Sequence, residues 1–306
     1  MKTHAYKRFT FISVSLLIGL TLSLCLWVWN EQRQYTLNRD LIASLEYNDP
    51  KRAIRLVKAG ADPNTHYKPS PKPSFQNLWN HWIHSTPPTV DPYDLTAIQM
   101  ACGEVWLIRS AGLLGLGQFK PDAPELVETM LRHGANAGVL DNDWKRSLLM
   151  CAAASRRPAT VELLLKYGAN INARDKDGKT PLMWAYTSPE TIRLLVKYGA
   201  NVEDRDEKGD TALIVACSYG ASCDDATVPL LIAEGARVND QNRSGDTALW
   251  WAVYCWHTHK NIAQELLRYG ADPYLLDKRN DTPFKVAEAF HHSDLVALFR
   301  KYRKHP

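Results

Sequence analysis

Hydrophobic and polar positions along the chain form a unit that recurs several times. The clearest copy covers residues 175–204 and reads DKDGKTPLMWAYTSPETIRLLVKYGANVED. A polar turn comes first, a short apolar segment follows, and a second segment places Ile192, Leu195 and Val196 three and four residues apart. This spacing predicts an amphipathic helix, and the Gly-Ala-Asn after it predicts where the helix ends. The unit is therefore expected to be a polar turn followed by two short helices.

Two independent markers measure the period of this unit. The glycines that end the second segment are Gly134, Gly168, Gly199, Gly235 and Gly270, separated by 34, 31, 36 and 35 residues. The hydroxyl residues that open the first segment are Ser147, Thr180, Thr211, Thr247 and Thr282, separated by 33, 31, 36 and 35. Both series change together, which indicates stacked structural repeats with small insertions. Each apolar stripe is too small to fold alone, so neighbouring units must bury it.

The segments TPLMWA, TALIVA, TALWWA and TPFKVA, which start at Thr180, Thr211, Thr247 and Thr282, resemble the ankyrin repeat signature T-P-L-H-x-A. They match it at the Thr, the apolar third position and the Ala, and none has the histidine. The resemblance implies an all-α ankyrin-repeat solenoid, built from helix-turn-helix units with β-turn fingers. It also implies a non-enzymatic module that binds other proteins along a concave face of turn tips and first helices.

The same signals divide the chain. Residues 38–306 are expected to form the ankyrin repeat domain, after a short polar linker over 30–37. Within the domain we expect an amino-terminal capping repeat, an insertion rich in proline and aromatic residues, a divergent repeat with a second insertion, four regular repeats and a carboxyl-terminal capping repeat. These cover residues 38–64, 65–93, 94–137, 141–273 and 277–306 respectively.

Residues 9–29 contain no charged side chain. As a helix this run would extend about 31 Å, enough for a bilayer core. Lys2, Lys7 and Arg8 precede it in a short tail, residues 1–8, while Trp27 and Trp29 stand where an interfacial aromatic belt belongs. The pattern predicts a transmembrane helix; a cleaved signal peptide is the alternative. The positive charges favour a single-pass protein of the inner (cytoplasmic) membrane with its repeats in the periplasm, the alternative being repeats in the cytosol.

Composition and motifs narrow the chemistry. The 306 residues carry a formal charge of +4, and 23% of them are charged. This small net charge does not indicate a nucleic-acid partner, and we expect none. HExxH, GxSxG and nucleotide-loop motifs are missing from the sequence, so we expect no catalytic residues, metal site or cofactor. The cysteines lack a CxxC pair. Cys223 could close a disulfide on Cys217 or Cys255 in an oxidising compartment, and a buried free thiol is the other interpretation of Cys217.

The register of the repeats, combined with the resemblance, nominates partner-binding residues. On the fingers these are the residues just before each Thr and several earlier tips: Lys179, Asp210, Asp246, Asp281, Arg174, Arg205 and Arg243. Aromatic anchors at or near the exits of the first helices are Tyr219, Tyr254, Trp256 and Phe290. Trp250 and Trp251 are expected to fill the core. Trp79 and Trp82 in the first insertion either fold onto the first repeats or contact a partner.

Two hypotheses about function follow. The first is a membrane-tethered interaction module that docks a folded protein, for example to shield or neutralise a toxin or to support an enzyme. The second is a structural or assembly component that engages other membrane proteins through the anchor and the aromatic insertion.

Overall fold

The computed structural model describes residues 2–65, 96–102, 122–141, 144–219, 226–255 and 260–301, with side chains from residue 23 onward and without that of Lys260. Every regular element in these ranges is a helix. The helices are α1 (Lys2–Glu46), α2 (Pro50–Lys58), α4 (Ala97–Cys102), α6 (Pro124–Arg132), α7 (Leu148–Ala154), α8 (Pro158–Lys166), α9 (Pro181–Trp184), α10 (Pro189–Lys197), α11 (Ala212–Ser218), α12 (Thr227–Ala233), α13 (Ala248–Tyr254), α14 (Lys260–Arg268), α15 (Pro283–Ala289) and α16 (Ser293–Lys301).

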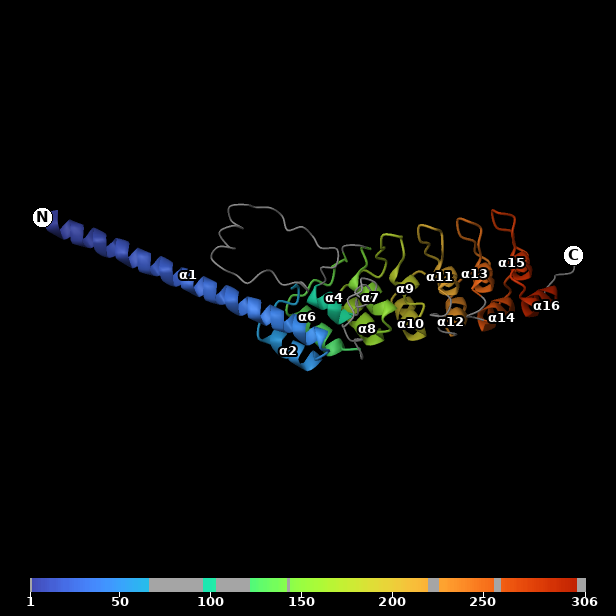
Figure 1. The fold of residues 1–306 in the computed structure, drawn as a ribbon, viewed down its shortest axis with the longest axis horizontal. Coiled ribbons are helices and arrows are strands. Elements are labelled where there is room, and N and C mark those ends of the chain that lie inside the picture. Colours follow the sequence, from blue (N-terminus) through green and yellow to red (C-terminus); the bar gives the residue numbers. More distant parts are fainter. Residues whose placement is uncertain are drawn as a thin grey trace.

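The helices from α7 onward stack as pairs into an elongated solenoid (Figure 1). The first helices α7, α9, α11, α13 and α15 form one row, and the second helices α8, α10, α12, α14 and α16 form the other. The turns that precede the first helices project from one side of the stack as fingers. This arrangement agrees with the predicted all-helical solenoid.

Hydroxyl caps start most of the first helices. The side chains of Ser147, Thr211, Thr247 and Thr282 each accept a hydrogen bond from the backbone N–H three residues later. Such a cap satisfies one of the donors that a helix start leaves open. Thr180 makes no such bond, and α9 after it has only four residues. The predicted capping role is therefore present in four of these five positions.

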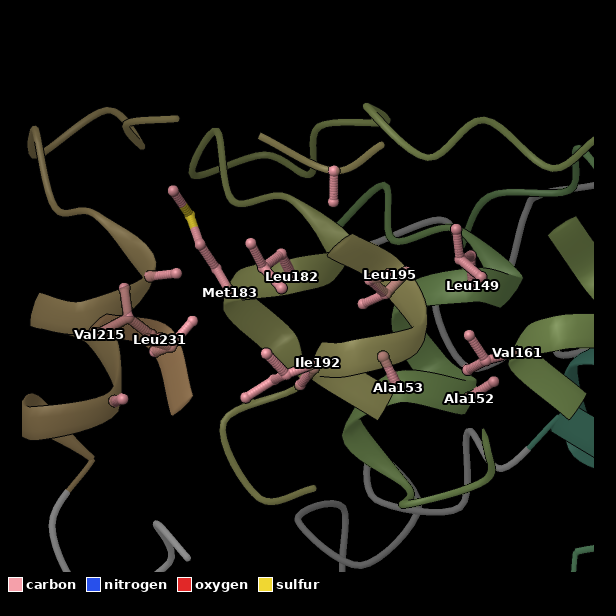
Figure 2. Close-up of a cluster of buried hydrophobic side chains, with 14 of the residues drawn as sticks. Leu149, Ala152, Ala153, Val161, Leu182, Met183, Ile192, Leu195, Val215 and Leu231 are labelled. Carbon is pink, nitrogen blue, oxygen red and sulfur yellow. The ribbon is translucent and has the colours of Figure 1, made fainter. Parts of the chain in front are cut away.

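The apolar core is shared between neighbouring repeats. Figure 2 shows Leu182 and Met183 of α9 and Ile192 and Leu195 of α10 facing the interior of the stack, with the side chains of the adjoining repeats around them. All four are at most 2% exposed. Burial of a side chain of this size is worth about 1.5–3 kcal/mol, and here it depends on the presence of the next repeat.

Helix α1 corrects the predicted membrane segment. It runs without interruption for 45 residues, so the apolar run 9–29 and the polar residues 30–37 belong to one helix. Its last turns pack into the first repeat, where Leu41, Ile42 and Leu45 are buried. Among the helices the structure describes, none combines the length and the apolar character that crossing a bilayer requires. The predicted transmembrane helix over 9–29 and the single-pass inner-membrane location that rested on it are therefore wrong. The prediction considered the hydropathy of residues 9–29 alone. In the structure this run continues through polar residues to Glu46, and the end of the helix packs into the first repeat.

Candidate partner-binding face

Each finger is closed by the side chain of one Asp or Asn. The Oδ1 atom of Asp175 accepts hydrogen bonds from the backbone N–H groups of Asp177 at 3.0 Å and Lys179 at 2.8 Å. Asp206, Asn242 and Asp277 make the same pair of bonds two and four residues ahead, at 2.8–2.9 Å. Such side-chain bonds to the backbone fix a turn locally. The fingers are therefore preorganised before any partner arrives.

Neighbouring fingers are also joined to one another. The backbone N–H of Arg243 donates to the Lys208 carbonyl at 2.9 Å, and that of Lys278 donates to the Ser244 carbonyl at 3.0 Å. Gly209 has a φ of +80°, and a Cβ there would lie 2.9 Å from the Arg243 nitrogen. Only glycine satisfies both the positive φ and this close approach. The fingers thus form a connected comb along one edge of the solenoid.

Arg174 and Arg205, nominated as partner-binding residues, bridge consecutive fingers. The Nη1 atom of Arg174 donates to the carbonyls of Gly178 at 2.9 Å and Arg205 at 2.7 Å. That of Arg205 donates to the carbonyls of Gly209 at 2.9 Å and Gln241 at 2.8 Å. Much of their donor capacity is therefore already used to hold the comb together. Gln241 repeats this bridge in the next finger, a role that the register alone did not reveal.

The residues just before each Thr differ in exposure. Asp210 and Asp246 are 7% and 4% exposed, whereas Asp281 is exposed and Lys179 is half-buried. Asp210 accepts a hydrogen bond from the Asn242 side-chain amide at 2.7 Å. Burial raises the pKa of both the Asp210 and the Asp246 carboxyl groups, with a further contribution from neighbouring carboxylates. These two aspartates therefore lie at the base of the fingers rather than at their tips.

Aromatic side chains line the first helices next to the comb. Tyr219 stacks on Tyr186 with ring centroids 4.6 Å apart, and the Lys179 ammonium lies 4.9 Å from the Tyr219 ring centroid and donates to its hydroxyl at 2.7 Å. Further along, Tyr254 stacks on Trp250 at 5.3 Å and meets the edge of Phe290 at 5.5 Å.

We call the surface made by the fingers and these rings the finger face. The finger face exposes 40% of Tyr219, 50% of Tyr254 and 49% of Phe290. Trp250 is 8% exposed, as expected for a core residue, while Trp251 is partly buried. Sequence reasoning missed Trp184, the last residue of the short helix α9, and Tyr186, which follows that helix.

Several nominated residues lie outside the described chain. They are Trp79, Trp82, Trp256 and Cys223. Residues 66–93 of the predicted insertion also lie outside it. Cys217 is buried in α11. The disulfide between Cys217 and Cys223 stays a prediction. Arg243 itself is exposed on its finger.

Comparison with known protein families identifies the family to which the chain belongs. Three overlapping segments, residues 119–206, 188–277 and 221–303, match the sequence model of ankyrin repeats. These segments cover more than half of the chain, which belongs to the ankyrin repeat family. The family resemblance seen in the sequence is confirmed. A search of curated proteins found no match to the chain. Ankyrin repeats indicate a protein–protein interaction module of a generally non-enzymatic kind.

Proposed function

We propose that the protein binds a folded protein partner through the finger face, with Tyr219, Tyr254 and Phe290 as its anchors. The observation that supports this proposal is the exposure of three aromatic side chains beside a preorganised comb of fingers. Aromatic residues are enriched at protein interfaces and among the residues that contribute most to binding. Tyr219 already packs on Tyr186, and Tyr254 packs on Trp250 and Phe290. Little side-chain freedom is therefore lost when a partner covers these rings.

The charged fingers complement the rings. Arg243 and Asp281 are exposed on neighbouring fingers and carry opposite charges. Mixed charge at the edge of an interface contributes to selectivity and the rate of encounter more than to affinity. The assembly alternative depended on a membrane anchor and on residues 65–93, and no contact in the described chain favours it. A single function is therefore proposed.

The opposite side of the solenoid supplies a matched control. Tyr167, Tyr198 and Tyr269 follow the second helices α8, α10 and α14 and are 41%, 38% and 45% exposed. Their exposure resembles that of the three finger-face rings. The second helices that they follow form the row farther from the fingers (Figure 1). Two triple alanine variants, one for each face, therefore remove comparable surface from the two sides.

The experiment compares partner capture by the two variants. Tagged full-length chains are purified from their own cells, co-purifying proteins are quantified by mass spectrometry, and far-ultraviolet circular dichroism checks the fold. Loss of even one anchor of about 2 kcal/mol weakens binding roughly 30-fold, so the finger-face variant should lose its partner. The variant of the opposite face should keep it. Loss confined to the opposite-face variant would refute the proposal.

A further inference from the structure

A cleft of about 380 Å³ opens on the finger face between the fingers at 206–210 and 242–246. Its lining includes Asp206, Asp210 and Asp246 from the fingers, Tyr219 beyond the end of α11, and Trp251 of α13. This volume is at the lower end for ligand pockets. It has room for one long side chain of a partner and not for a folded segment.

Charge in the cleft is sorted by depth. The three aspartates are 4–7% exposed, Lys179 is half-buried with its ammonium bonded to the Tyr219 hydroxyl, and Lys208 and Arg243, which also line the cleft, are exposed. Asp206 Oδ2 is buried, and no group in the described part of the chain hydrogen-bonds to it. Burial raises the pKa of Asp210, and the charges of Asp206 and Asp246 add to that effect. The inner end of the cleft therefore holds negative charge that is incompletely compensated.

One finger further along, the protein fills the equivalent place with its own arginine. The Arg279 guanidinium lies 4.7 Å from the centre of the Trp250 ring. It reaches back to the preceding finger, where it donates to Asp246 Oδ1 at 2.6 Å, and it also donates to Asp277 Oδ2 at 2.9 Å. The chain thus already contains an arginine held between finger carboxylates and an aromatic ring.

Ser244 is the counterpart of Arg279 in the finger at 242–246. Arg279 follows Asp277 by two residues, and Ser244 follows Asn242 by two. Serine is too short to reach Asp210 as Arg279 reaches Asp246. In the next repeat, Arg279 occupies the place beside Asp246. The corresponding place beside Asp210 belongs to the cleft, and Ser244 lines it.

We propose that this cleft receives a single arginine side chain from the partner protein, with its guanidinium on the Asp210 carboxylate and its stem against Tyr219 and Trp251. Asp206 adds negative charge next to the pair. Arginine fits better than lysine because its planar guanidinium pairs with a carboxylate through two bonds and stacks on aromatic rings. The exposed Lys208 and Arg243 repel a run of basic residues, so the matching segment presents one arginine among neutral or acidic neighbours.

This inference names a feature of the partner and rests on the proposed function. Its test uses no natural partner. The probes are three short peptides, acetyl-Gly-X-Gly-amide, in which X is arginine, lysine or citrulline, the neutral isostere of arginine. The readout is the indole N–H resonance of Trp251 in the full-length chain, labelled with ¹⁵N-tryptophan and assigned with Trp251→Phe.

The arginine peptide should shift the Trp251 resonance saturably, and the citrulline peptide should bind at least tenfold more weakly. Asp210→Asn should weaken arginine binding about tenfold, whereas Asp281→Asn, which changes an exposed finger carboxylate outside the cleft lining, should not. Ser244→Arg should abolish the saturable shift because it places an internal guanidinium beside Asp210. Equal binding of arginine and citrulline, or an unchanged shift in Ser244→Arg, would overturn the inference.

The outcomes also separate this inference from the proposed function. If the arginine peptide fails to bind while the finger-face alanine variant still loses its partner, only the arginine assignment falls. If the peptide binds while that variant keeps its partner, the arginine site is supported and the proposed docking face is refuted.

Discussion

Removing the side chain that closes one finger tests how the finger face is held. Asp175 is 7% exposed and accepts three hydrogen bonds, from the backbone N–H groups of Asp177 and Lys179 and from the Trp184 indole at 2.9 Å. Asp175→Ala leaves three partly buried donors without their acceptor. At about 1 kcal/mol each, the free energy of unfolding should fall by about 3 kcal/mol.

Asp175→Asn is the matched variant, and the chain shows what it should do. Asn242 closes its own finger with two backbone bonds of 2.9 Å, as the aspartates do. Asparagine at 175 should therefore keep the two backbone bonds and lose only the bond from Trp184, at a cost of about 1 kcal/mol. The difference between the two variants, about 2 kcal/mol, measures the closure of the finger.

Urea unfolding of the full-length chain, followed by circular dichroism and tryptophan fluorescence, provides the measurement. The alanine variant should unfold at a clearly lower urea concentration than the asparagine variant, which should be close to the unchanged protein. If the two variants unfold together, the side-chain bonds do not hold the finger and the reasoning is refuted.

Two further predictions use the same assay. Gly199→Ala meets only the strain of a φ of +95°, since nothing lies within 4 Å of its Cβ, and should cost about 1 kcal/mol; Gly209→Ala also strikes the Arg243 backbone and should cost more. Equal costs would contradict the tight approach of the fingers. Burial opposes ionisation of Asp277, but hydrogen bonds from the Asp281 backbone and Arg279 outweigh it and hold its pKa below the usual value. Asp277 therefore stabilises the fold above the unfolded pKa, and this stabilisation is lost as pH falls through the folded pKa. Asp210, whose pKa is raised, costs stability once pH rises through its folded pKa. At pH 7 Asp277→Asn should thus destabilise and Asp210→Asn should not, a contrast that should fade as the pH falls through the folded pKa of Asp277; a contrast independent of pH would contradict this assignment.

The repeats could be predicted because their signals are local. The hydroxyl caps, the glycines after the second helices and the apolar spacing of residues such as Ile192 and Leu195 act within one unit, and the unit recurs. The structure confirms that Ile192 and Leu195, which this spacing selects, are buried in the core. The periodicity therefore sufficed for the solenoid.

The finger face was less accessible to sequence reasoning. Arg174 and Arg205 were nominated from register, yet their guanidiniums reach carbonyls 31 and 36 residues away in the sequence. Such bonds depend on the distance between stacked fingers, which no local pattern contains. The contact of Arg279 with Trp250 was missed for the same reason.

The apolar run over 9–29 failed for a different reason. Hydropathy treats a window as an independent helix, whereas α1 continues to Glu46 and packs Leu41 and Leu45 into the first repeat. A local average cannot show how far a helix continues or what its far end contacts.

Site-specific photo-crosslinking in cells tests most directly whether the finger face is where a protein docks. A photoreactive phenylalanine analogue is placed singly at Tyr219 or Tyr254 and, on the opposite face, at Tyr198 or Tyr269. All four sites are 38–50% exposed. The account predicts one protein adduct that forms from Tyr219 and Tyr254 and is missing or much weaker from Tyr198 and Tyr269. The same adduct at equal yield from both faces, or from the opposite face alone, would contradict it.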